Sequence, residues 1–184
     1  MLPRAPVAIL VVVLALPGCR RREQWSPPAT PEEALSRATA TARGGQLKRL
    51  FRLLDKNSRW SLMSVHNSHR EICKLVRAHY PEARQPGELR RCHPAERARD
   101  AEAFFVERAG RHPELVEPLR RFKPPGKRTG SGERVELVGG GRRLAFCRVD
   151  GAWWYCGLRE AFDELKLKAT RDLTTVRENI ETFR

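Results

Sequence analysis

Apolar residues recur every three or four positions along most of the chain after residue 30, a spacing typical of helices with one buried face. Thr30, Pro31 and Glu33 form a capping box that predicts the start of a first helix, and Gly44-Gly45 ends it. Ser58 is expected to cap a third helix that stops at Tyr80-Pro81. The expected helices cover residues 31–43, 47–54, 58–79, 94–109, 113–122 and 158–183.

The pattern changes to short strands after residue 133. Residues 134–138 and 142–149 flank three glycines, and Asp150-Gly151 is a strong hairpin signal before residues 152–157. The proline-rich and glycine-rich stretches 81–94 and 120–132 are expected to be loops. The sequence therefore predicts an α+β fold, in which a helical majority packs on a small antiparallel sheet of about three strands and a long C-terminal helix follows.

The amino terminus has the layout of an export signal. Arg4 precedes ten unbroken apolar residues, 7–16. A helix of that length is about 15 Å long, half the thickness of a bilayer core, so it suits a signal peptide and not a membrane span. We expect residues 1–18 to be this signal peptide.

The segment Leu16-Pro17-Gly18-Cys19 resembles the lipobox of bacterial lipoproteins. The resemblance implies cleavage before Cys19 and a diacylglycerol on its thiol. Residues 19–29 would then be a lipidated tether, and residues 30–184 one globular domain. Arg20 follows the cysteine where inner-membrane lipoproteins of this kind have Asp, so the resemblance implies the outer membrane, facing the periplasm. The alternative is an ordinary secretory signal in which Cys19 is incidental.

The chain is strongly basic, with a formal net charge of +14. Arg20–Arg22 lie beside the expected anchor, and the loop from Arg120 to Arg128 contains no acidic residue. These runs favour anionic lipid or an anionic envelope polymer as partner, whereas an exported protein should meet little nucleic acid. The alternative is genome composition, because the chain has 29 Arg but only 7 Lys.

Four cysteines remain after Cys19, and an even number in an exported protein predicts two disulfides. We expect the local pairs Cys73–Cys92 and Cys147–Cys156 over the crossed pairings and over free thiols. The second pair depends on the hairpin register. A two-residue loop makes these cysteines diagonal neighbours, a three-residue loop forbids the bridge, and a four-residue loop sets them directly opposite, where bridging is easiest.

Other candidate chemistry is sparse. His66, His69 and Cys73 share a helix face at zinc-ligand spacing, but no second half-site accompanies them, so we expect no metal. Trp153 and Tyr155 alternate with Trp154 on one strand, and burial on both faces is favoured over sugar stacking. No motif for a nucleophile or a phosphate loop is present, so no catalytic residue and no cofactor are expected.

The stretches TPEEAL, GGQLKRLFRLLD and RVDGAWWYC resemble lipoproteins of the nuclear-transport-factor-like cone fold, to which ketosteroid isomerases belong. The resemblance covers residues 30–60 and 133–157 and implies a curved sheet around a pocket, with none of the family's catalytic residues matched here. Our first hypothesis is a membrane-anchored cell-envelope lipoprotein that acts as a non-catalytic binding or assembly module, its protein partner unknown. The alternative is a lipid-anchored small-ligand binder or enzyme with a cone pocket, which an enclosed apolar cavity would favour.

Overall fold

The computed structural model describes residues 25–182, so the expected signal peptide, Cys19 and Arg20–Arg22 lie outside the described residues. Within that range the chain has the predicted α+β fold with a long C-terminal helix. The helices are α1 (Pro31–Arg43), α2 (Leu47–Leu53), α3 (Lys56–His79), α4 (Gln85–Arg97), α5 (Ala101–Arg111), the 3-10 turn η1 (Pro113–Leu115), α6 (Glu117–Arg120) and α7 (Arg159–Thr182). The strands are β1 (Lys127–Thr129), β2 (Arg134–Gly139), β3 (Arg142–Val149) and β4 (Ala152–Tyr155).

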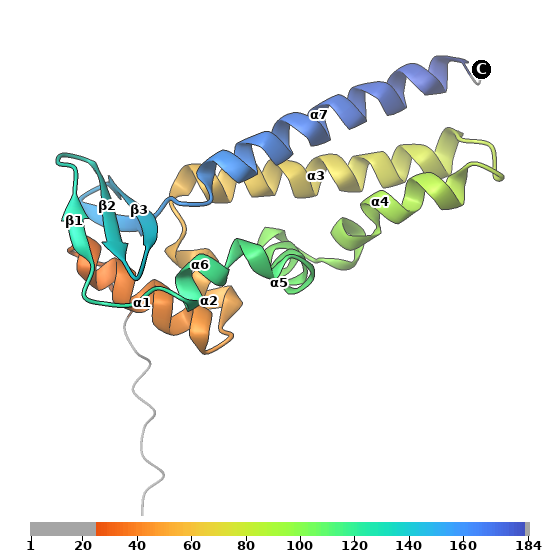
Figure 1. Ribbon diagram of the computed structural model, residues 1–184. Helices are drawn as coiled ribbons and strands as arrows, with labels where there is room; N and C mark the ends of the chain where they lie inside the picture. Colours follow the sequence, from red (N-terminus) through yellow and green to blue (C-terminus); the bar gives the residue numbers. More distant parts are fainter. Residues whose placement is uncertain (1–24, 183–184) are drawn as a thin grey trace, which may run out of the picture.

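One part of the fold is a body in which helices pack on the sheet. The strands form an antiparallel meander in the order β1-β2-β3-β4, with α1 packed against it (Figure 1). Phe146 and Tyr155 come from the sheet and Phe105 and Phe162 from helices, and all four are buried in the same core. These large side chains fill the space between sheet and helices.

The other part is an arm of three helices that extends away from the body. Helices α3 and α7 run side by side, and α4 returns along α3 from the tip (Figure 1). The arm has a small core of its own, which includes Val76, Val176 and Ile180 around the Cys73–Cys92 disulfide. Helix α7 is continuous from Arg159 to Thr182.

The middle of the chain is more helical than the sequence predicted. Residues 81–94 were expected to be a loop, but α4 covers most of them. Pro86 stands in the first turn of α4, where no intrahelical donor is lost, whereas Pro94 lies inside the helix. Asp100 then caps a separate helix, α5, by accepting a hydrogen bond from the Ala103 amide.

The cap of helix α3 also lies three residues earlier than predicted. Asp55 is its cap, and Ser58 lies within the first turn. The helix runs without interruption through Asn67-Ser68. Thr30 and Glu33 do cap α1, since the Thr30 hydroxyl accepts from the Glu33 amide at 3.1 Å.

The described sheet has four strands, one more than the sequence indicated. The extra strand, β1, lies within the expected loop 120–132 and pairs antiparallel with β2. All three of its residues are exposed, so no apolar alternation marks it. The β3–β4 hairpin has a two-residue turn, with Asp150 and Gly151 at φ values of 52° and 79°.

Candidate functional site

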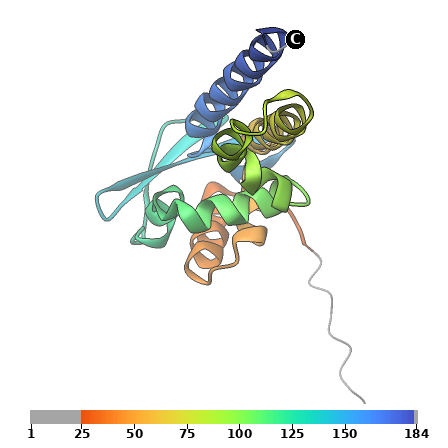
Figure 2. The same ribbon diagram turned by 90° about the vertical axis from the view of Figure 1, so that its right-hand side faces the viewer.

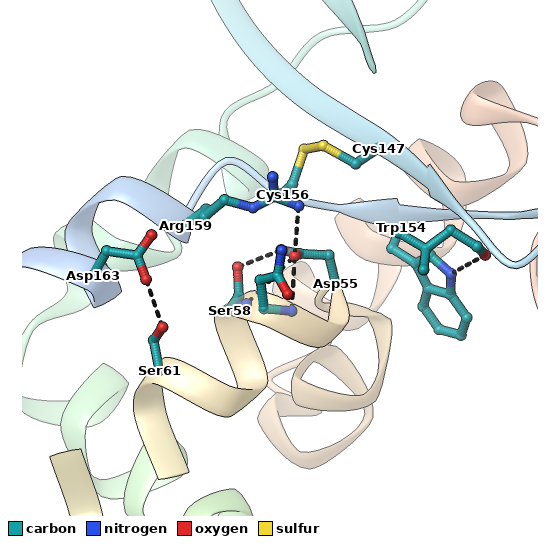
Figure 3. A network of polar contacts seen from close by, with 10 residues as sticks. Asp55, Ser58, Ser61, Cys147, Trp154, Cys156, Arg159 and Asp163 are labelled. Carbon is teal, nitrogen blue, oxygen red and sulfur yellow. Dashed lines mark hydrogen bonds and ion pairs between the residues drawn. A yellow bond between two sulfur atoms is a disulfide. The ribbon is translucent and has the colours of Figure 1, made fainter. Parts of the chain in front are cut away.

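A buried polar cluster joins the first turns of α3 and α7 (Figure 3). Asp55 is fully buried, and its Oδ1 accepts hydrogen bonds from the Asn57 and Ser58 amides at 3.1 and 3.4 Å. Arg159 Nη2 donates to the same oxygen at 2.8 Å, and the Ser58 hydroxyl donates to Oδ2. The Asp55 amide in turn donates to the Tyr155 carbonyl of β4 at 3.1 Å. One carboxylate thus holds the starts of both long helices at the end of the sheet.

The serines of this cluster have structural roles. The Ser61 hydroxyl donates to Asp163 of α7, as Ser58 does to Asp55 (Figure 3). An activated serine needs a base that takes its proton and a path for substrate. Ser58 is fully buried, and each hydroxyl donates to a carboxylate within the fold. The cluster fixes the starts of the two helices, and the burial of Ser58 leaves its hydroxyl without contact to solvent.

Both local disulfides are present. Cys73 of α3 is bonded to Cys92 of α4, with a Cα–Cα distance of 5.7 Å. Cys147 of β3 is bonded to Cys156, which directly follows β4, with a Cα–Cα distance of 5.8 Å. All four cysteines are buried, as expected for structural disulfides.

The Cys147–Cys156 bond forms in the register of a two-residue hairpin loop. We expected a four-residue loop to make this bond easiest. Cys147 lies opposite Trp154, so Cys156 is its diagonal neighbour. The bond therefore forms in the diagonal register, and not in the directly opposed one that was expected to make it easiest. Sheet twist brings one diagonal closer than the other. Moreover, Cys156 lies just beyond the last paired residue, where its amide still donates to the Ala145 carbonyl at 3.0 Å.

The two candidate histidines of the metal cluster differ in burial, since His66 lies in the core and His69 is partly buried. His66 is buried, with Nε2 3.0 Å from the carbonyl oxygens of both Ala95 and Ala98, so this nitrogen carries the proton and donates. Burial lowers the pKa of His69, and nearby Arg108 lowers it further. Cys73 is in a disulfide, and residues 25–182 contain no group of three potential metal ligands.

The aromatic strand is buried on one face only. Trp153 and Tyr155 point into the core, and burial raises the pKa of Tyr155. Trp154, on the other face, is half-buried (Figure 3). Its ring lies 5.7 Å from that of Trp25 and 5.6 Å from the guanidinium carbon of Arg59. Trp154 therefore connects the first described residues to the start of α3.

The basic segment Arg120–Arg128 is less available than its composition indicated. Arg120 Nε donates to the Ala42 carbonyl at 3.2 Å, and Arg121 is ion-paired with Glu117. The Arg128 guanidinium carbon lies 5.8 Å from the centre of the Trp153 ring. These contacts engage three of its arginines within the domain, so the segment is a weaker candidate for an anionic surface.

A second basic surface was missed by the sequence analysis. The apolar character of Trp60 and Met63 favours the buried face of a helix, but these residues are 60% and 39% exposed. They belong to a row of exposed residues spaced three or four apart on α3, which we name the α3 stripe. Its members are Lys56, Trp60, Met63, Asn67, Arg70, Lys74 and Arg77.

The α3 stripe lines two open grooves that share Asn67 and Arg70. One groove, of about 580 Å³, lies between α3, α2 and the start of α5, and Phe51, Trp60 and Met63 give it an apolar end. The other, of about 620 Å³, continues along α3 beside α4 and is lined mainly by charged side chains. The i, i+4, i+7 recurrence of Lys56, Trp60 and Met63 was the signal in the sequence.

Comparisons with known proteins add no relative. No family model matches this sequence, and neither the curated proteins nor the solved structures contain a significant match. The candidate functional surface is therefore defined by its own geometry: an exposed, mostly basic groove system on α3, next to the aromatic residues where the described chain begins.

Proposed function

We propose that this protein is a lipid-anchored lipoprotein of the cell envelope that acts as a non-catalytic binding or assembly module. Cys19 carries the lipid, residues 1–18 are removed as a signal peptide, and the domain faces the periplasm, on the outer membrane rather than the inner. The surface that binds is the α3 stripe with its two grooves.

The observation that carries this proposal is the pair of buried disulfides. All four cysteines of the described residues are bonded, Cys73 to Cys92 and Cys147 to Cys156. Disulfides of this kind persist in oxidising compartments such as the bacterial periplasm and are rare in reducing cytosol. They support export, which the lipobox-like segment ending at Cys19 independently predicts.

The non-catalytic part of the proposal is supported by how the polar side chains are used. Asp55, Ser58 and Arg159 are hydrogen-bonded to one another at a helix junction, and His66 donates to backbone carbonyls. The core between helices and sheet is filled with aromatic rings. The exposed basic and apolar side chains of the α3 stripe lie instead along open grooves. Such grooves suit an extended partner surface better than a small enclosed substrate.

The alternative of a cone-fold ligand binder or enzyme receives no specific support. Helix α1 lies against the sheet, where that fold would have a pocket, and α1 contributes the buried side chains Ala34, Ala38 and Ala42 to the core. Residues 25–182 also contain no helix that is both long and apolar enough to cross a bilayer.

The anchor is tested in a bacterial host with the full chain, Cys19→Ser and the matched control Arg20→Gln. We expect the parent and Arg20→Gln to partition into the detergent phase and to incorporate labelled fatty acid. Cys19→Ser should be soluble or remain as a larger precursor, without label. If Cys19→Ser partitions, migrates and labels as the parent does, the lipoprotein assignment is wrong.

A further inference from the structure

The α3 stripe combines exposed apolar and basic side chains at one surface. Trp60 and Met63 lie near the start of α3, and Arg70, Lys74 and Arg77 follow over its later turns. The opposite face of α3, with Leu62, Val65 and Val76, is buried. A helix with large apolar and basic residues on its free face is typical of surfaces that lie on anionic membranes.

Much of the charge of this surface is not neutralised by ion pairs, although Arg77 is paired with Glu96. Lys56, Arg70 and Lys74 form no salt bridge with any described residue. Among the acidic side chains that line the grooves, Glu96 is bonded to Arg77. The other groove carboxylates with a partner are Asp100, paired with Arg99, and Glu102, paired with Arg52. Glu71 alone of the groove carboxylates has no such pair in residues 25–182. The stripe therefore presents unpaired positive charge.

The stripe is also continuous with the place where the described chain begins. Arg59, which lines the apolar groove, lies over Trp154, and Trp25 lies against the same ring. Trp25 is itself 54% exposed. Cys19 and Trp25 are six residue steps apart, which span at most about 20 Å when extended. An anchor at Cys19 would thus keep the first turns of α3 close to the bilayer.

The described chain begins at the side of the body away from the tips of the strands (Figure 2). Helix α7 packs along α3 but contributes no side chain to either groove. A surface that contacts the membrane through the stripe would therefore leave the outer side of α7 in water.

We infer that the α3 stripe lies on the membrane surface and binds anionic phospholipid headgroups, so that the domain is held in one orientation beside its anchor. This inference rests on the proposed lipid anchor. Trp60 and Met63 insert at headgroup level, and Arg70, Lys74 and Lys56 contact lipid phosphates. Each basic residue adds about 5-fold to binding at an anionic surface, which falls as salt rises.

Lysine footprinting tests the orientation, because the chain has only 7 lysines and two of them, Lys56 and Lys74, are in the stripe. The full-length lipoprotein is reconstituted in vesicles of phosphatidylglycerol and phosphatidylethanolamine, or in neutral detergent, and treated with a water-soluble amine reagent. We expect labelling of Lys56 and Lys74 to fall several-fold in the anionic vesicles. Lys166, exposed on α7, should label equally in both.

Matched variants separate the stripe from general charge. Arg70→Glu should restore labelling of Lys56 and Lys74, whereas Arg171→Glu, an exposed arginine on α7, should not. Replacing Trp60 with Ala should also raise labelling, and Leu167→Ala, the exposed apolar residue on α7, should leave it unchanged. Each variant is first checked for an unchanged unfolding midpoint.

The outcomes distinguish this inference from the proposed function. If the protein does not float with vesicles at all, the anchor is wrong and the inference fails with it. If it floats but Lys56 and Lys74 label as readily as Lys166, the anchor stands and the stripe does not contact lipid. Protection that appears in native envelopes but not in vesicles would assign the stripe to an acidic protein partner and overturn the lipid assignment.

Discussion

The guanidinium carbon of Arg59 lies 5.6 Å from the centre of the Trp154 ring, which joins the first turn of α3 to strand β4. Trp25 contacts the same ring, and the Trp153 amide donates to the Pro28 carbonyl at 2.9 Å. Cation–π and ring contacts of this kind each contribute about 1 kcal/mol. Trp154 therefore fixes the segment that leads towards the expected anchor.

Replacing Trp154 with Ala should release this segment. Trp154 is half-buried, so we expect a loss of about 2 kcal/mol in the free energy of unfolding, less than for a core tryptophan. Amide exchange at Trp153, whose donor pairs with Pro28, should become faster. The exposed Trp60→Ala serves as the control and should leave that amide unchanged. Equal exchange at Trp153 in both variants would contradict the role of Trp154.

Local signals in the sequence identified much of the fold. The capping box at Thr30 and the hairpin at Asp150-Gly151 are where they were expected. The cysteine pairs followed from short separations, 19 residues for Cys73–Cys92 and 9 for Cys147–Cys156. Each of these features is decided by residues close together in the sequence, so the sequence could reveal it.

Features that depend on distant contacts were harder to predict. Strand β1 has no buried residue, and it forms by antiparallel backbone pairing with β2. Helix α4 forms despite Pro94, with Cys92 and Ala95 buried on one side. The apolar character of Trp60 favours a core position, yet the packing of α3 against α4, α5 and α7 decides which face is buried. The α3 stripe was missed for that reason.

The Asp55–Arg159 ion pair gives a second prediction. Asp55→Asn would leave Arg159, whose side chain is 29% exposed, without its carboxylate and would weaken the cap of α3. We expect a loss of about 3 kcal/mol in unfolding free energy, from the uncompensated charge and the weaker cap. Urea unfolding measures it. Glu160→Gln is the control, since the Glu160 side chain is 87% exposed and should change stability little. A small effect at Asp55 would mean that solvent already screens the pair.

The disulfide between the helices of the arm gives a third prediction. Cys73 and Cys92 are separated by 19 residues, so the chain-entropy model assigns their bond about 3 kcal/mol. The double variant Cys73→Ala and Cys92→Ala should unfold at lower urea and expose α4 to protease before the sheet. In Cys147→Ala with Cys156→Ala, with a 9-residue separation, the expected loss is smaller, about 2.5 kcal/mol, and α4 should stay protected. Cleavage that begins in the sheet in both variants would contradict a local role.

His69 of α3 predicts that the stability of the protein depends on pH. Burial lowers the pKa of His69, Arg108 lowers it further, His66 and Lys168 act in the same direction, and Asp172 opposes them. The unfolded chain therefore binds a proton more readily than the folded protein. This contribution to stability is complete above pH of about 6.5 and is lost as pH falls towards the lowered folded value.

The pH prediction is tested by comparing the parent protein with His69→Gln. Unfolding free energies from urea titrations between pH 5 and pH 8 should fall with acid in the parent and fall less steeply in the variant. His79→Gln is the control, because it removes an imidazole that is exposed at the end of α3. Parallel pH profiles for the parent and His69→Gln would show that other groups account for the acid sensitivity.

The last prediction tests which face of α3 is buried, on which the α3 stripe depends. Leu62 and Met63 are adjacent in sequence, but Leu62 has no exposed surface and Met63 is 39% exposed. Truncating a buried leucine leaves a cavity, so Leu62→Ala should lower the unfolding free energy by about 3 kcal/mol. Met63→Ala removes a side chain that faces solvent and should change it by about 0.5 kcal/mol or less. Comparable losses at the two positions would place Met63 in the core, as its apolar character alone indicated, and would remove the apolar end of the stripe.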